Sequence, residues 1–237
     1  MSNPYFNFKQ FTIRQDKCAM KVGTDGVLLG AWTDVAHTDN VLDVGTGTGL
    51  IALMIAQRRR HAIINAIDID QDACVQASEN VAHSVFKNRI QVIRQSFFDY
   101  SSEKKYDLII SNPPYFKNAL TGPDKKRNTA RHSDSLPLLQ FIRHAIPLLS
   151  ENGRIALILP VIISDELDFI MATHRLNERH RTNVITIEGD QPKRFLIEMS
   201  KKIPQEQDNR AKTLILETKD HQRTPQYQTL MNDFYLL

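Results

Sequence analysis

The four residues Asn112-Pro113-Pro114-Tyr115 carry the most specific chemical pattern in this sequence. They follow an apolar run at residues 106–111, so the two prolines are expected to end a strand and to stiffen the backbone there. Proline keeps its carbonyl, so Asn112 offers its side-chain oxygen and Pro113 offers a rigidly held backbone oxygen as acceptors. An amino group on an sp² carbon can donate to both. We therefore expect Asn112 and Pro113 to hold such an amine.

An exocyclic amine such as adenine N6 is a poor nucleophile, because its lone pair is delocalised into the ring. Two acceptors that fix both of its hydrogens favour pyramidalisation and turn the lone pair toward an electrophile, so no strong base is needed. The ring of Tyr115 could stack on a base that has left its strand. The alternative is that the motif only ends a strand and buries a tyrosine.

A second pattern lies upstream, where the apolar residues 41–44 lead into Gly45-Thr46-Gly47-Thr48-Gly49 and then into residues 50–57, which lack Gly and Pro. This order predicts a strand, a tight turn and a helix, with Gly45, Gly47 and Gly49 allowing a ligand to approach the backbone. A dinucleotide fingerprint would have a glycine at the sixth position, where this chain has Leu50. The pattern therefore favours a nucleoside ligand without a pyrophosphate, of which S-adenosylmethionine is the commonest for such a sheet.

Three carboxylates lie where this cofactor needs acceptors. Asp68 closes the strand expected at residues 62–69, where a carboxylate can bind both ribose hydroxyls. Asp99 follows the next strand and could accept from the adenine amino group. Asp43 lies at the base of the glycine turn and could orient that loop or approach the cationic methionine end. Each could instead be a cap or turn residue, although Asp70 is the better helix cap.

Strands and helices alternate along most of the chain, which predicts a mostly parallel sheet with helices on both faces. Further strands are expected at 90–94, 154–159, 183–187, 194–199 and 212–216, and further helices at 70–83, 136–149 and 165–175. In the last third, one strand is expected to be antiparallel. A length of 237 residues, with 41% hydrophobic and 24% charged residues, fits a single domain over residues 1–237.

Composition excludes several other classes. The longest apolar runs are too short to span a membrane, and the N-terminal residues do not resemble a secretory signal. The two cysteines, Cys18 and Cys74, have no metal-ligand spacing and are too few for a disulfide framework. We therefore expect a cytoplasmic protein without a bound metal.

The net charge is only +3, but the basic residues are unevenly distributed. Residues 117–132 contain five of them against Asp124, which gives 5 − 1 = +4: Lys117, Lys125, Lys126, Arg127 and Arg131. Residues 1–22 carry a further excess of 4 − 1 = +3. Such segments are often just solvated.

With these motifs in place, the chain resembles the class I S-adenosylmethionine-dependent methyltransferases, and within them the N6-adenine and glutamine-amide group. Residues 18–32, CAMKVGTDGVLLGAW, together with residues 109–115, IISNPPY, are similar to those of bacterial tRNA adenine-37 N6-methyltransferases. The resemblance implies a seven-stranded sheet in the order 3-2-1-4-5-7-6, with residues 1–40 packing over the donor site. It also implies N6-methyladenosine beside the anticodon as the product.

By the same resemblance, the donor-binding residues are those of the glycine turn with Asp68 and Asp99, and the residues that hold the target base are Asn112, Pro113 and Tyr115. A tRNA substrate would also give the basic residues 117–131 a function, because a stem presents many phosphates. No obligate protein partner is implied.

Several alternatives stay open at this point. A protein-glutamine methyltransferase would use the same turn on an amide. Such enzymes look to carry an N-terminal helical substrate domain, and the 40 residues before Val41 are too few for one. A ribosomal RNA or DNA adenine methyltransferase would hold the same base. A non-catalytic RNA-binding module would not bind the donor.

Overall fold

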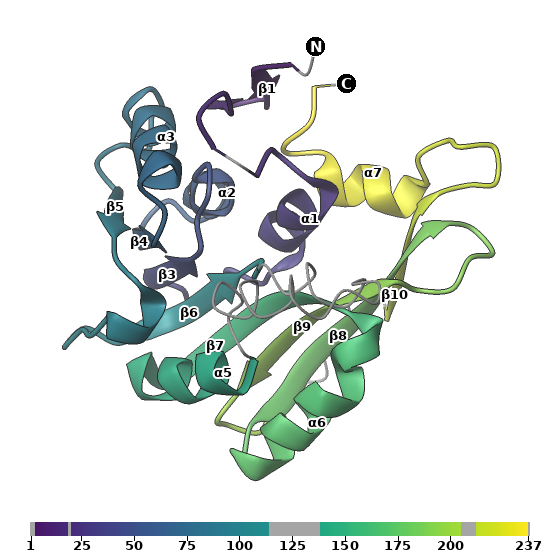
Figure 1. Cartoon of the computed structure of the whole chain (residues 1–237). Coiled ribbons are helices and arrows are strands. Elements are labelled where there is room, and N and C mark those ends of the chain that lie inside the picture. The colour runs from purple at the N-terminus through teal and green to yellow at the C-terminus, as the bar shows by residue number, and fades with distance from the viewer. Residues whose placement is uncertain (1–2, 19, 114–137, 205–211, 237) are drawn as a thin grey trace, which may run out of the picture.

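Alternating strands and helices build a central sheet that is covered on both faces (Figure 1). The structure, a computed structural model, describes residues 3–18, 20–113, 138–204 and 212–236. The strands of the central sheet are β3 (Asn40–Val44), β4 (Ile63–Asp68), β5 (Ile90–Arg94), β6 (Tyr106–Ser111), β7 (Leu149–Pro160), β8 (Asn177–Ile187), β9 (Arg194–Ser200) and β10 (Thr213–Glu217).

The described strands follow the order β10-β8-β9-β7-β6-β3-β4-β5. From β5 to β8 this is the expected order 3-2-1-4-5-7-6, and β9 is the expected antiparallel member, since it runs antiparallel to both β7 and β8. The expectation of seven strands was wrong by one. β10 adds a parallel edge strand beside β8, because Leu214 and Leu216 are buried in the core under the C-terminal helix.

Helices pack on the sheet in two layers (Figure 1). One face is covered by α1 (Thr24–Trp32), α2 (Leu50–Arg58), α3 (Gln71–Ala82) and α7 (Pro225–Met231), and the other by α5 (Leu138–Ala145) and α6 (Ser164–Thr173). Single 3₁₀ turns are η1 (Phe97–Asp99), η3 (Ile146–Leu148) and η4 (Val161–Ile163). None of the helices in the described part of the chain has the length and apolarity needed to cross a membrane.

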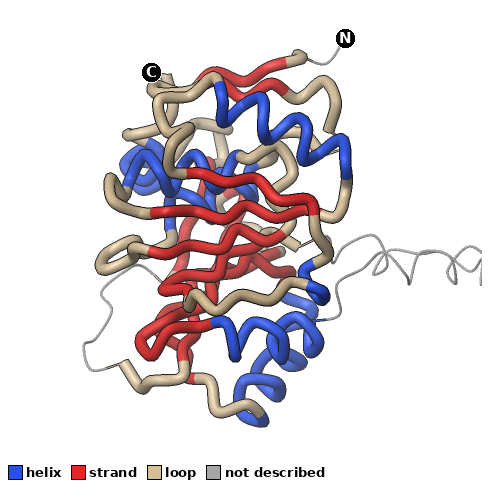
Figure 2. The backbone as a smooth tube through the Cα atoms, turned by 90° about the vertical axis from the view of Figure 1, so that its left-hand side faces the viewer, coloured by secondary structure: helices blue, strands red, loops and turns tan. Residues whose placement is uncertain are grey.

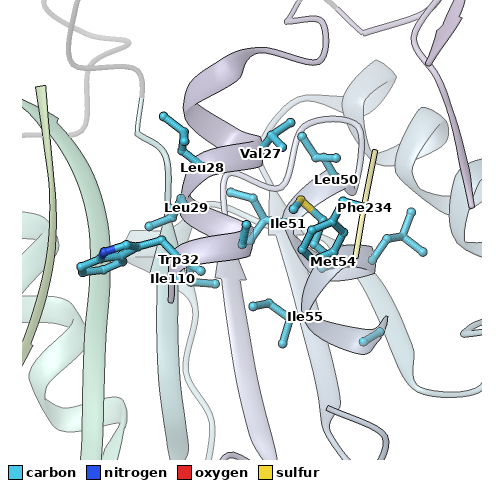
Figure 3. Packing of buried hydrophobic residues seen from close by; sticks show 14 of the residues in the cluster. Val27, Leu28, Leu29, Trp32, Leu50, Ile51, Met54, Ile55, Ile110 and Phe234 are labelled. Carbon is cyan, nitrogen blue, oxygen red and sulfur yellow. The ribbon is translucent and has the colours of Figure 1, made fainter. Parts of the chain in front are cut away.

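Helix α1 was not expected from the sequence, and it packs closely on α2. Two glycines one turn apart make this contact possible. A Cβ atom at Gly30 would lie 2.7 Å from Met54 Sδ, and one at Gly26 would lie 3.2 Å from Leu50 Cδ2. Figure 3 shows Leu50 and Met54 of α2 among the buried side chains that face α1. The glycines therefore let the two helix backbones approach.

The two ends of the described chain pair with each other. A two-stranded sheet, β1 (Tyr5–Asn7) with β2 (Thr12–Arg14), lies beside the C-terminal residues at one end of the molecule (Figure 2). Phe8 bridges to Tyr235, and the Lys9 N–H donates to the Phe234 carbonyl at 2.8 Å. The side chain of Phe234 is buried in the larger of the two apolar cores.

Candidate active site

The carboxyl ends of four neighbouring parallel strands meet at one edge of the sheet and carry most of the predicted site residues. In the order β6-β3-β4-β5, Asn112 follows β6, the glycine turn follows β3, Asp68 ends β4, and Asp99 lies in η1 after β5. Open α/β sheets bind ligands at this edge, next to the point where the strand order reverses. In this sheet the reversal lies between β3 and β6.

The glycine turn has left-handed backbone geometry at each of its glycines. The φ angles are +70° at Gly45, +56° at Gly47 and +81° at Gly49, a region that residues with a Cβ rarely adopt. The N–H groups of Gly45 and Thr46 donate to the Ile67 carbonyl of β4, which fixes the turn against the neighbouring strand. A Cβ atom at Gly45 would meet nothing within 4 Å. The space beside this backbone is therefore open.

Asp43 lies under the turn and is completely buried. Its Oδ2 accepts a hydrogen bond of 2.6 Å from the Thr46 hydroxyl and one of 3.2 Å from the Ala52 N–H of α2. Its Oδ1 is buried without a hydrogen-bond partner in the described structure. Burial raises the pKa of the Asp43 carboxyl to about 7, although both hydrogen bonds oppose the shift. Asp43 thus holds the turn to α2 and has one buried oxygen without a partner among the described residues.

Asp68 is half-buried at the end of β4 and is oriented by two backbone groups. Its Oδ2 accepts from the Gly47 N–H at 2.9 Å, and its Oδ1 accepts from the Asp70 N–H at 3.0 Å. A carboxylate has about four acceptor positions, so ~2 remain for a ligand. Asp70 caps α3 through a bond from the Ala73 N–H, as the sequence predicted.

Two apolar side chains beside these acids were missed by the sequence reasoning. Ile69 follows Asp68 and is 70% exposed, and Phe98 precedes Asp99 and is 37% exposed. Asp99 itself is exposed. Apolar surface of this kind next to hydrogen-bonding groups is typical of a site for a flat, partly apolar ligand. The sequence does contain a signal for them, because each is an apolar residue next to an acidic residue at the end of a strand or just after it.

Asn112 is half-buried and Pro113 is buried, directly after β6. The Ser111 hydroxyl donates to the Val44 carbonyl at 2.7 Å and thereby ties the start of this turn to the end of β3. Asn112 Nδ2 lies 3.9 Å from the position of a Cβ atom at Gly26, so the first turn of α1 lies beside the amide. Pro114, Tyr115, Lys117, Lys125, Lys126, Arg127 and Arg131 lie outside the described residues.

The two cysteines do not add a reactive nucleophile to the site. Cys18 and Cys74 are both buried, and burial raises the pKa of each thiol, to about 11 for Cys74. Thiols of this kind are poor nucleophiles at neutral pH. In the residues that the structure covers, no group of three or more His, Cys, Asp or Glu side chains could hold a metal ion.

Comparisons with known proteins agree with this geometry. A model of the methyltransferase small domain family matches residues 21–160, more than half of the chain. A protein of Parabacteroides distasonis named tRNA1(Val) (adenine(37)-N6)-methyltransferase is 50% identical over 238 residues, covering 100% of this chain and 99% of the relative. A protein of the same name from Trichodesmium erythraeum is 45% identical over 240 residues, with the same coverage.

Solved structures share the fold at low sequence identity. The structure of a predicted O-methyltransferase from Agrobacterium tumefaciens matches with a TM-score of 0.64 at 18% identity, covering 89% of this chain and 96% of that one. The structure of a ribosomal protein L11 methylase from Lactobacillus delbrueckii matches with a TM-score of 0.57 at 18% identity, covering 80% and 84%.

Proposed function

The chain belongs to the methyltransferase small domain family, and we propose that it transfers a methyl group from S-adenosylmethionine to N6 of adenine 37 in the anticodon loop of tRNA1(Val). The observation that carries the proposal is the position of Asn112 and Pro113, next to the glycine turn across the β3–β6 reversal. The full-length relatives that carry this activity in their names support the same substrate. A tRNA substrate also favours a cytoplasmic location.

The residues around the glycine turn fit the donor. The open space at Gly45 would admit a ligand against the backbone, whereas Gly49 lets the turn pack on α3, since a Cβ atom there would lie 3.4 Å from Ala77. Asp68 has acceptor positions left for the ribose hydroxyls, and Asp99 would accept from the adenine amino group. The unpartnered Oδ1 of Asp43 supports a position near the cationic methionine end. When bound, S-adenosylmethionine supplies an electrophilic methyl group on a sulfonium centre.

Asn112 and Pro113 would position the target amine. Their two oxygens would accept both N6 hydrogens, direct the nitrogen lone pair toward the methyl carbon and stabilise the charge that develops on nitrogen in the transition state. Catalysis then rests on alignment and electrostatics, without a general base. Tyr115 would stack on the flipped base, which offsets the cost of removing the base from its loop.

Residues 1–40 belong to the same domain in this proposal and pack over the donor site. Two contacts support this placement. Cys18 Sγ lies 4.0 Å from the position of a Cβ atom at Gly47, and Gly26 lies beside Asn112. The basic residues at 117–131 would bind phosphates of the anticodon stem.

A protein-glutamine methyltransferase is the nearest alternative, because an amide could occupy the same acceptors. A ribosomal RNA or DNA adenine methyltransferase would share the base pocket, and an RNA-binding module would need no donor. Labelled S-adenosylmethionine with a tRNA1(Val) transcript, a transcript carrying guanine at position 37, ribosomal RNA and a glutamine peptide separates these functions. We expect label only in the first transcript, at N6 of adenine 37. Label elsewhere, or none, would refute the proposal.

The variant Asn112→Ala tests the role of the acceptors. It removes one of the two oxygens that hold the amine, so we expect turnover to fall by roughly 100-fold or more, while donor affinity stays within about tenfold. Single-turnover methyl transfer and calorimetry with S-adenosylhomocysteine measure the two quantities. Activity close to that of the unaltered protein would remove Asn112 from the mechanism.

A further inference from the structure

Arg194 is a half-buried cation near the candidate site, and it has no role in the methyl transfer proposed above. It is the first residue of β9 and pairs in register with Pro160, the last residue of β7, so it lies at the carboxyl edge of the sheet. β7 is the next strand after β6, which leads to Asn112. Arg194 therefore lies close to the base-holding turn.

One carboxylate holds this arginine in place. Arg194 Nε lies 2.6 Å from Oδ1 of Asp25, in the first turn of α1. The contact is an ion pair without the geometry of a linear hydrogen bond, since Nε has no hydrogen-bond partner in the described structure. Burial raises the pKa of the Asp25 carboxyl, and the charge of Arg194 opposes that shift. The pair joins the first turn of α1 to β9.

The same helix turn lies beside the side-chain amide of Asn112. Gly26 follows Asp25, and a Cβ atom at Gly26 would lie 3.9 Å from Asn112 Nδ2. Asp25 is thus the sequence neighbour of the glycine that lies beside the Asn112 amide.

The hydrogen-bond donors of Arg194 are largely unused. Its side chain is 20% exposed, and because Nε is buried, the exposed part lies elsewhere on the side chain. No hydrogen bond to its terminal nitrogens is found among the described residues. Arg181 of β8 is a close match at 19% exposed, but its three nitrogens contact Glu178, Ser164 and Asp168. Within the described part of the chain, Arg194 therefore keeps donors for a ligand and Arg181 does not.

We propose that Arg194, oriented by Asp25, binds a backbone phosphate of the RNA strand next to the flipped target adenosine. The inference rests on the proposed function. A guanidinium carries N–H groups that match two phosphate oxygens, and it stays charged throughout the physiological pH range. Fixing the phosphate beside the base would set the position of N6 relative to Asn112. Arg194 is in this sense a positioning residue for the substrate.

The test compares Arg194→Gln, Arg194→Lys and the matched control Arg181→Gln in the full-length protein. A tRNA1(Val) transcript is bound at a series of salt concentrations in the presence of saturating S-adenosylhomocysteine. For Arg194→Gln we expect tRNA affinity to fall about tenfold and the slope of log Kd against log salt to decrease by about one. Arg194→Lys keeps the charge and should retain the slope, with a smaller loss of affinity. Arg181→Gln should change neither.

Donor affinity, measured by calorimetry, should be the same in all three variants, and thermal unfolding shows that they are folded. An unchanged salt slope in Arg194→Gln, or an equal change in Arg181→Gln, would overturn the inference. Loss of donor affinity with normal tRNA affinity would assign the arginine to the donor instead. Failure of the proposed function is distinguishable, because the unaltered protein would then not methylate this tRNA at all.

Discussion

Asp43 shows how a single buried carboxyl can make the stability of the molecule depend on pH. Its pKa rises from an ordinary value of 3.8 to about 7 in the folded state, so between these values the folded protein holds a proton that the unfolded chain has lost. The contribution of this group to stability is therefore complete at low pH and is lost as the pH rises toward 7.

The variant Asp43→Asn measures this effect, because asparagine has a similar shape and does not titrate. We expect the free energy of unfolding of the unaltered protein, relative to the variant, to fall between pH 4 and pH 7 by at most about 1.4 kcal/mol per pH unit. Urea unfolding at fixed pH values gives this difference. A difference that is constant over the interval would mean that Asp43 is ionised in the folded state.

Asp68 should act on the donor rather than on the chemical step. Replacement by Ala removes the acceptors for the ribose and releases the Gly47 N–H, so we expect donor affinity to fall by about 100-fold and turnover at saturating donor to fall less. Asp72→Ala is the matched control, since it removes an exposed carboxylate in the first turn of α3, four residues after Asp68. A larger effect on turnover than on affinity would contradict the ribose role.

At the level of residues, the sequence predicted where the site residues lie in the sheet, but not how buried they are or which hydrogen bonds they form. Asp68 and Asn112 could be placed because each follows an apolar run, and the ends of parallel strands share one edge. The missing partner of Asp43 Oδ1 and the exposure of Ile69 and Phe98 depend on contacts between distant segments, which spacing along the chain does not show.

Among the elements, helix α1 is the one that the sequence pattern did not predict. Seven of its nine residues are buried, so it lacks the alternation of apolar and polar faces by which a surface helix is recognised. The two glycines inside it also have a low helix propensity. The strands and helices from β3 to β7 were predicted because each has a regular apolar pattern, whereas β10 as a parallel edge strand depends on packing under α7.

Gly30→Ala tests the close packing of α1 on α2. The added methyl group would lie 2.7 Å from Met54 Sδ, so we expect a loss of about 1 to 3 kcal/mol in the free energy of unfolding. Adding Met54→Ala should relieve the clash, and the double variant should lose less than the sum of the two single variants. Strict additivity in urea unfolding would show that the two residues do not compete for the same space.

For the molecule as a whole, the pairing of the two chain ends is expected to contribute to global stability. Phe234 is 2% exposed in the core below α1 and α2, whereas Leu236, two residues later, is 60% exposed. Phe234→Ala should lower the free energy of unfolding by about 3 kcal/mol, because it leaves a cavity. Leu236→Ala should change it by less than about 0.5 kcal/mol. Equal effects in urea unfolding would contradict this description of the C-terminal segment.

The bridge from Phe8 to Tyr235 also bears on how the protein is made. Lys9 and its contact Asn232 are separated by 223 residues, so the ribosome delivers one side of this junction long before the other. The nascent chain can form most of the sheet before the C-terminal segment is available to pair with the β1–β2 hairpin. This junction can therefore close only after residues 232–235 have been synthesised.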